Sequence, residues 1–305
     1  MQAVFKPIFI GLLFGMFHVC LAQQTPTFSE YNYNVFILNS AYAGFEKDTE
    51  LVFSSAGFSN ELDGAPKSTT FSFNTSLREG QVGLGAGVIH DEVGASKTTT
   101  AFAAYSYKLF FDSQDDRPHW QHYYPTVLSF GITAGAQFYR DNLLDLGIID
   151  DPKFQRNINT IIPTVGVGFM FNYKELFVGV SMPNVLGTEL ASEDNLDLST
   201  PFYIYGGYRI FTNIFRETMI KPSFLLKKEG GVPLQADINV AVNLKNKIEF
   251  GAGYRTNGSL NLLLGVYALK KLRVMYNYNM ASGDAPITTT HGIVLGYRFG
   301  EGYSE

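Results

Sequence analysis

The residues of this chain that could do acid–base, nucleophilic or metal chemistry are few and poorly spaced for it. His119 and His122 form an i, i+3 pair, which would need a helix and a third ligand to hold a metal ion, and the polar sequence around them predicts a loop. His90 and Asp91 are adjacent near the end of a predicted strand, so their side chains point to opposite faces. They do not support each other as base and orienting acid. The histidines therefore predict neither a metal centre nor a hydrolase.

The acidic and glycine-rich segments do not form a ligand site either. One acidic cluster lacks the compact alternating spacing and central glycine of a calcium loop. It consists of Glu189, Glu193, Asp194 and Asp197. The Gly-x-Gly runs lie inside predicted strands rather than before helices, so they do not predict a phosphate-binding loop. We expect a protein that is not an enzyme and uses no cofactor and no metal.

The first 22 residues have the features of a cleaved export signal. Residues 1–6 include one positive charge, residues 7–19 are almost wholly apolar, and small residues precede a cleavage point after Ala22. Lipid attachment at Cys20 is the alternative, which Val19 disfavours because a small residue is expected at that position. Cleavage after Ala22 removes the single cysteine and excludes disulfides and thiol chemistry from the mature chain.

Apolar side chains alternate with small or polar ones in runs of about ten residues along the rest of the chain. From 128 to 139 the apolar set is Leu128, Phe130, Ile132, Ala134, Ala136 and Phe138, and the interleaved set is Ser129, Gly131, Thr133, Gly135, Gln137 and Tyr139. The same pattern returns from Leu234 to Leu244. Period two places the two sets on opposite faces of a strand. A long series of such strands behind an export signal predicts an all-β protein, a transmembrane antiparallel barrel with apolar residues toward lipid.

Composition supports this interpretation. The formal net charge of −5 provides no basic surface for nucleic acid. The mature sequence contains no apolar run long enough for a membrane helix. A secreted β-sandwich shares the alternation, but 305 residues without a clear domain boundary exceed what one sandwich usually needs.

We predict four parts: a signal peptide at 1–22, an extended lead at 23–48, a barrel at 49–299 and a tail at 300–305, which we expect to be frayed. The barrel should have about 14 strands, an even number as in bacterial barrels. The predicted strands span 49–58, 68–77, 81–90, 98–110, 126–140, 162–172, 175–182, 201–211, 217–227, 233–244, 247–256, 259–269, 271–280 and 288–299.

The lengths of the connections predict the orientation. Most odd-numbered strands are followed by longer polar loops, at 59–67, 91–97, 141–161, 183–200 and 281–287. Such barrels have short periplasmic turns and longer outside loops, so both chain ends should be periplasmic. Two connections disagree: 111–125 is long where a short turn is expected, and 256–259 is short, although Asn257-Gly258 suits a hairpin turn.

Glycines gather on the predicted lumen face, at Gly83, Gly85 and Gly87 of one strand and at Gly166 and Gly168 of another. We expect them to relieve crowding where the wall curves. The alternative is a close approach by a plug or by the backbone of a partner.

Several segments resemble, in the right order, the PorP/SprF-like outer-membrane proteins of the Bacteroidota type IX secretion and gliding machinery. The lead from Tyr31 to Gly44 is similar to the family's signature, with Ser40 in place of a proline. Further similar segments are 63–67 with the following strand, 83–94, 105–108, 181–186 and the closing strand 291–299. The positions of these motifs that we take as candidate partner-interaction residues are Tyr31, Asn34, Asn39, Ala41, Tyr42, Ala43, Gly44, Asp63, Gly64, Ala65, Pro66, Asp91, Pro183 and Asn184.

The resemblance implies a non-enzymatic outer-membrane protein that supports secretion or surface display of cargo such as adhesins, or that anchors periplasmic machine subunits. Its partners would be the cargo, those subunits and membrane lipid. A lumen of about 14 strands is too narrow for a folded adhesin, so we expect a docking platform rather than the conduit. The lead would plug the lumen or reach periplasmic partners, and its aromatic residues would pack inside the barrel or recognise a partner. A porin-like diffusion channel for small solutes is the alternative function.

Overall fold

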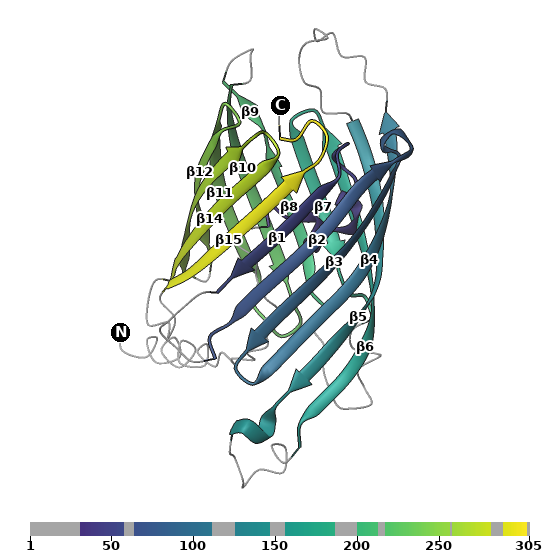
Figure 1. Ribbon diagram of the computed structural model, residues 1–305, viewed down its shortest axis with the longest axis vertical. Helices are drawn as coiled ribbons and strands as arrows, with labels where there is room; N and C mark the ends of the chain where they lie inside the picture. The colour runs from purple at the N-terminus through teal and green to yellow at the C-terminus, as the bar shows by residue number, and fades with distance from the viewer. Residues whose placement is uncertain are drawn as a thin grey trace, which may run out of the picture.

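The computed structural model describes residues 31–57, 64–111, 126–146, 156–186, 200–212, 217–256, 258–281 and 289–303. Most of these residues lie in one antiparallel sheet that closes on itself (Figure 1). Its strands are β1 (Glu50–Ala56), β2 (Lys67–Leu77), β3 (Val82–Val93), β4 (Ser96–Phe111), β5 (Thr126–Asp141), β6 (Ile158–Tyr173), β7 (Leu176–Met182), β8 (Phe202–Tyr208), β9 (Ile210–Phe211), β10 (Thr218–Lys228), β11 (Gln235–Leu244), β12 (Ile248–Arg255), β13 (Ser259–Ala268), β14 (Leu272–Ala281) and β15 (Thr289–Arg298).

The sheet is a closed barrel of fourteen wall positions. Each strand pairs with its neighbours along the chain, and β15 pairs with β1 to close the wall. Of the fifteen segments, β8 and β9 share one position, because both pair with β10 in a single register. The ladder between them is interrupted opposite Pro222, which has no N–H to donate. The predicted fold class and the even strand number are confirmed.

All fourteen predicted strands are present, but some run further than the sequence suggests. The predicted loop 91–97 is wrong: β3 continues through Asp91 to Val93, β4 begins at Ser96, and only two residues connect them. The apolar alternation ends near position 90, whereas backbone pairing needs no apolar side chain and continues. At the short 256–259 connection, Gly258 has a φ of +87° and its N–H donates to the Arg255 carbonyl at 2.9 Å.

The two faces of the wall match the alternation. On β5, Ile132 is 58% exposed on the outer surface, while Ser129 of the other set is fully buried. On β11, Ile238 is 63% exposed and Asp237 is buried. The outer face is therefore apolar and the inner face polar, as lipid outside and a filled lumen inside require. Among the described residues, no helix is long and apolar enough to cross a membrane.

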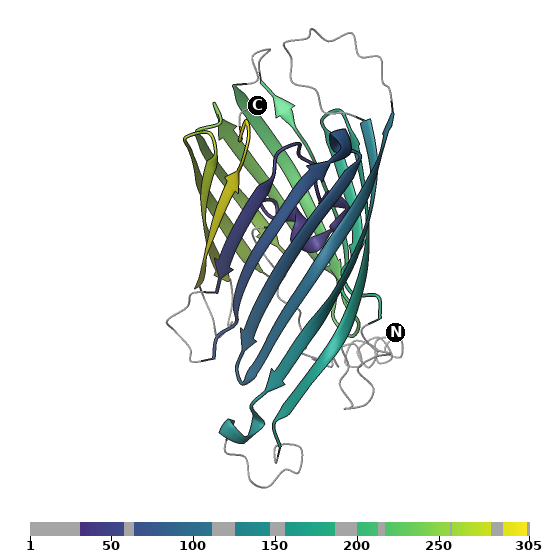
Figure 2. The same ribbon diagram turned by 45° about the vertical axis from the view of Figure 1, so that its right-hand side comes forward.

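The wall begins and ends at the same rim, where Glu50 pairs with Arg298 and the Phe299 N–H donates to the Thr49 carbonyl. We call it the turn rim, because it also holds the short turns after β2, β6, β11 and β13, including the 3₁₀ turn η3 (Arg78–Gly80). At the opposite end, the loop rim, β5 and β6 project furthest, and the 3₁₀ turn η4 (Leu143–Leu146) follows β5 (Figures 1 and 2).

The part of the lead that the structure describes, from Tyr31 to Phe45, lies inside the barrel (Figure 2). Residues Tyr31–Phe45, here called the plug, include the helical turn α2 (Val35–Leu38) and the 3₁₀ turn η2 (Ser40–Tyr42). Phe36, Ala41 and Ala43 are at most 1% exposed. Of the two predicted places for the lead, the structure shows the lumen.

Candidate functional site: the plug and its contacts

Asn39 is the centre of the plug. Its Oδ1 accepts a hydrogen bond from the Ala41 N–H at 2.9 Å and so caps η2. Its Nδ2 lies 2.9 Å from the Phe169 carbonyl of β6. The same nitrogen lies 3.3 Å from the Val180 carbonyl of β7 and 3.3 Å from the Tyr205 hydroxyl of β8. One amide thus sets the local turn and fastens it to three wall strands.

Two other asparagines of the plug bind different parts of the wall. Asn34 accepts a hydrogen bond from Ser72 Oγ at 3.0 Å and donates to Thr70 Oγ1 at 3.4 Å, both on β2. Asn32 donates to Ser223 Oγ of β10 at 3.0 Å. Short polar side chains suit these places because the wall leaves little room between backbone and plug.

The two tyrosines that begin the plug reach the far side of the barrel. The Tyr31 hydroxyl accepts a hydrogen bond from Asn239 Nδ2 of β11 at 2.8 Å. The Tyr33 hydroxyl donates to Glu249 Oε1 of β12 at 2.6 Å, and the Tyr33 carbonyl accepts from Arg273 Nη2 of β14 at 2.6 Å. The plug is therefore bound around most of the barrel circumference.

Backbone carbonyls anchor the end of the plug. Ser129 Oγ of β5 donates to the Ala41 carbonyl at 2.6 Å. The Ala43 carbonyl accepts from Ser106 Oγ at 2.7 Å and from Lys108 Nζ at 2.8 Å, both on β4. These bonds satisfy carbonyls that the short helical turns leave without an intrahelical partner. Tyr42, half-buried, stacks on Phe45 with a centroid distance of 5.5 Å.

The lumen glycines make room for the plug. A Cβ on Gly83 would lie 1.8 Å from the Ala43 carbonyl oxygen, and one on Gly131 would lie 2.2 Å from the Ala41 nitrogen. A Cβ on Gly168 would lie 2.0 Å from Asn39 Oδ1. At Gly83 and Gly168 these contacts support the alternative given above, a close approach by a plug. Gly166 instead faces the Pro183 carbonyl oxygen, which would lie 2.4 Å from its Cβ.

Gly44 ends the plug in a conformation that a side chain would strain. Its φ is +56°, and a Cβ there would lie 2.5 Å from the Thr75 carbonyl oxygen. Its N–H donates to Asn74 Oδ1 at 3.2 Å. The turn that carries the chain from the lumen into the wall therefore needs glycine at this position.

A cluster of charges and aromatic rings lies beside the plug at the turn rim. This rim cluster consists of Glu46, Glu50, Arg273, Arg298 and Tyr303. The Tyr303 hydroxyl donates to Glu50 Oε1 at 2.7 Å, and its ring lies 4.8 Å from the Arg273 guanidinium and 4.3 Å from that of Arg298. Each guanidinium also pairs with Glu50, at 3.5 Å and 3.4 Å.

The rim cluster shows that the tail is not frayed over its described part. Tyr303 is 7% exposed, and its N–H donates to the Lys270 carbonyl at 2.7 Å. The Gly302 N–H donates to Asp48 Oδ2 at 3.0 Å. Arg273 holds the Tyr33 carbonyl as well as Tyr303, so one side chain joins the plug to the tail.

Burial controls the protonation of the plug tyrosines. Burial, with a smaller contribution from the Asp237 carboxylate, raises the pKa of Tyr31 to about 12. Burial and the nearby Glu249 carboxylate raise the pKa of Tyr33 well above its usual value. Both phenols remain neutral and able to donate at any physiological pH.

The other candidate residues from the sequence lie outside the plug, in the connections that follow β1 and β7 and near the end of β3. The Gly64 carbonyl accepts from the Gly94 N–H at 2.9 Å, Pro66 is exposed, and Ala65 between them is half-buried. Asn184, 8% exposed, accepts from the Leu186 N–H at 3.2 Å, next to Pro183. Asp63 lies outside the described residues. The candidate set is thus two separate groups, one in the plug and one outside it.

Of the histidine and acidic residues considered for metal binding or hydrolysis, the structure describes His90 and Asp91. His90 bonds to Thr99 Oγ1 at 2.8 Å and to Glu92 Oε1 at 3.2 Å, while Asp91 bonds to Ser68 from the opposite face. Within the described ranges, no group of three or more His, Cys, Asp or Glu residues could hold a metal ion. The acidic cluster at 189–197 and the pair His119 and His122 lie outside those ranges.

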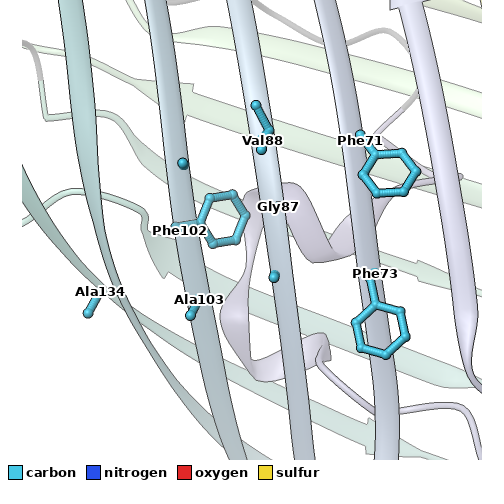
Figure 3. Close-up of a pocket in the computed structure, with 9 residues that line it drawn as sticks. Phe71, Phe73, Gly87, Val88, Phe102, Ala103 and Ala134 are labelled. Carbon is cyan, nitrogen blue, oxygen red and sulfur yellow. The ribbon is translucent and has the colours of Figure 1, made fainter.

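A shallow hollow of about 450 Å³ lies on the outer wall over β2 to β5 (Figure 3). Phe71, Phe73 and Val88 point outward around small residues such as Ala103 and Ala134. Its lining side chains are all apolar, so it offers no acid, base or nucleophile.

The groups on the wall that hold the plug were not among the residues predicted from the sequence. Serine, asparagine and lysine at lumen-facing positions, such as Ser129 and Lys108, cannot be distinguished in the sequence from the ordinary polar residues of a barrel interior. Tyr303 was missed because it follows the last strand. The signal that could have found the contacts is the small residues on the inner face.

Comparisons with known proteins found a family match and several similar solved structures. Residues 20–297 match the family model described as type IX secretion system membrane protein PorP/SprF. A comparison with curated proteins found no significant match. Among solved structures, the outer membrane protein Omp33 of Acinetobacter baumannii is similar over 84% of this chain and 100% of its own, with 11% identity and a TM-score of 0.45. BamA of Haemophilus ducreyi lacking POTRA domains 1–3 is similar over 83% of this chain and 71% of its own, with 9% identity and a TM-score of 0.41. The family match includes the plug and nearly the whole wall, and Tyr303 lies beyond it.

Proposed function

Because this chain belongs to the PorP/SprF family of type IX secretion system membrane proteins, we propose that it is a plugged, non-enzymatic docking barrel. It supports secretion or surface display of cargo proteins such as adhesins and binds periplasmic subunits of the machinery. The family and the fold are those of a secretion-system barrel in the outer membrane. The cargo role, the cleaved signal peptide and the link to gliding are parts of the proposal.

The observation that carries the proposal is the plug. A diffusion channel needs a continuous aqueous path, but here Asn39 and Ala41 lie in the lumen at most 1% exposed. Hydrogen bonds join the plug to wall strands from β2 to β14. A barrel filled in this way offers its rims to partners, and cargo would be held at the loop rim, which includes the exposed Pro66.

Single-channel recording in planar bilayers tests whether the plug closes the lumen. We expect wild-type protein to be electrically silent. Gly131→Ala should conduct, because its Cβ would lie 2.2 Å from the plug nitrogen of Ala41 and must displace the plug. Gly251→Ala is the matched control: the three atoms nearest its Cβ would all belong to β11, at 2.9 Å or more. Steady conductance of wild-type protein would favour the porin-like alternative instead.

Loss of the protein in cells tests the secretion role. In a deletion strain we expect general nutrient uptake to continue and at least one surface protein to be lost from the cell surface, measured by surface proteolysis and mass spectrometry. Complementation with the wild-type gene should restore it. Normal display of every surface protein in the deletion strain would refute the proposed function.

A further inference from the structure

The turn between β13 and β14 combines two unfavourable features. Leu269 is 91% exposed. It also has a φ of +52°, and Lys270 after it has a φ of +59°. A hairpin turn with two consecutive residues at positive φ strongly favours Asn or Gly, because other side chains are strained in the left-handed region. A leucine here is poor both for the fold and for solubility, which points to a role outside the fold.

The neighbouring turn adds positive charge. Lys245, Lys247, Lys270 and Lys271 stand on two adjacent turns, joined where the Tyr267 N–H donates to the Lys247 carbonyl at 2.8 Å. Glu217, 3.6 Å from Lys245, and Glu301 in the tail offset only part of this charge. We call Leu269 and these four lysines the turn patch. It is a basic surface around one projecting leucine on a chain whose net charge is −5.

The turn patch is held rigidly. The Lys270 carbonyl accepts from the Tyr303 N–H at 2.7 Å, and the Lys271 carbonyl accepts from the Arg298 N–H at 2.9 Å. Tyr303 is itself fixed between two guanidiniums of the rim cluster. The buried tail and the end of β15 thus fix the backbone of the turn. A surface that is ordered before binding loses less entropy on binding.

The patch lies at the end of the wall, at the turn rim. Tyr297 and Phe299 pack edge to face on the outer wall, 4.9 Å between centroids, as aromatic residues do at a membrane interface. Tyr297 pairs with Leu272 and the Arg298 N–H donates to the Lys271 carbonyl, so residues 269–271 continue past Tyr297 to the level of Arg298 and Phe299. The lysines beside Leu269 favour an aqueous partner over acyl chains, because a charged group is costly to bury in an apolar medium.

We infer that the turn patch docks a water-soluble periplasmic protein whose surface has carboxylates around an apolar pocket. Leu269 enters the pocket, and the lysines pair with the carboxylates around it. This inference rests on the proposed function and on its expectation that the turn rim is periplasmic. Charged residues around a contact increase the association rate and select the partner, while a buried leucine at its centre slows dissociation.

Site-specific photocrosslinking in living cells tests the inference. A photoreactive residue at Lys247 should crosslink to a water-soluble protein through an acidic segment, identified by mass spectrometry. Leu269→Asn and Lys270→Glu should each reduce the yield about tenfold or more. The same residue placed at Glu79, exposed on the η3 turn of the same rim, is the matched control and should not capture that protein.

Other outcomes overturn the inference. These are crosslinks only to lipid, crosslinks only to a second copy of the chain, equal capture from Glu79, and yields that neither substitution changes. Leu269→Asn keeps the fold, because asparagine accepts this turn, so unfolding does not mimic lost docking. The proposed function fails separately, through wild-type conductance or normal display in the deletion strain. Lost display in the deletion strain without a crosslink at Lys247 refutes only the docking surface.

Discussion

Three asparagines in one segment allow the attachment of the plug to be measured in steps. Asn32, Asn34 and Asn39 make one, two and four described hydrogen bonds respectively. Replacing each with alanine removes these bonds without changing the wall. The effect on plug release should follow the number and length of the bonds.

The magnitudes come from the hydrogen-bond geometry. A buried neutral hydrogen bond contributes about 1 kcal/mol net. The Asn39 amide has two N–H groups shared among three acceptors and one accepted bond, so Asn39→Ala should cost about 3 kcal/mol. Asn34→Ala, which loses one good and one long bond, should cost about 1.5 kcal/mol, and Asn32→Ala about 1 kcal/mol. These values correspond to roughly 100-fold, 10-fold and 5-fold more frequent plug opening.

Hydrogen exchange with mass spectrometry measures plug opening. Peptides covering 31–45 report it in detergent-solubilised protein, since the plug amides of Asn39, Ala43 and Phe45 donate to Val35, Ser40 and Tyr42. Peptides from β6 serve as the internal control and should exchange as in wild type. The reasoning is refuted if Asn39→Ala opens the plug no more than Asn32→Ala, or if all three variants exchange like wild type.

Three further predictions concern the tail, the plug tyrosine and the turn. Tyr303→Phe keeps the ring between Arg273 and Arg298 but removes the charged hydrogen bond to Glu50, so unfolding in urea should show a loss of about 1.5–3 kcal/mol; an unchanged midpoint would contradict the role given to the tail. Because burial raises the pKa of Tyr31 from 10.0 to about 12, its stabilisation is complete below pH 10 and is lost as the pH rises through 12. The absorbance difference at about 295 nm between wild type and Tyr31→Phe should therefore rise near pH 12, and a rise near pH 10 would show an accessible phenol. Leu269→Asn should leave the barrel equally stable or up to about 1 kcal/mol more stable in the same urea experiment, and a clear destabilisation would show that the leucine serves the fold.

The wall could be predicted closely because its signal is local. Lipid outside and polar groups inside impose the alternation seen from Leu128 to Tyr139, and the burial of β5 follows it. The errors occur where the lipid signal ends, at the β3–β4 turn, since the backbone ladder continues past the last apolar residue. The interruption of the strand ladder opposite Pro222 follows from the missing N–H of proline, so the sequence could also have predicted it.

The candidate site was predicted in part. The family resemblance selected Asn34, Asn39, Ala41 and Ala43, and the structure places all four in the lumen. Their wall partners, such as Ser129 and Arg273, have no local signature. The sequence identifies Gly131 and Gly168 only as small residues, because the plug residues that pack against them lie far away in the sequence.

The sequence by itself determined the barrel, its strand number and the polarity of its two faces, because a period of two depends only on neighbouring residues and on the solvent each face meets. Only the tertiary structure decided that the lead fills the lumen and that the tail supports a turn. The contacts that decide this join residues far apart in the chain, 130 positions for Asn39 with Phe169 and 240 for Tyr33 with Arg273. No periodicity records such pairs, since they form only once the wall has closed around the plug.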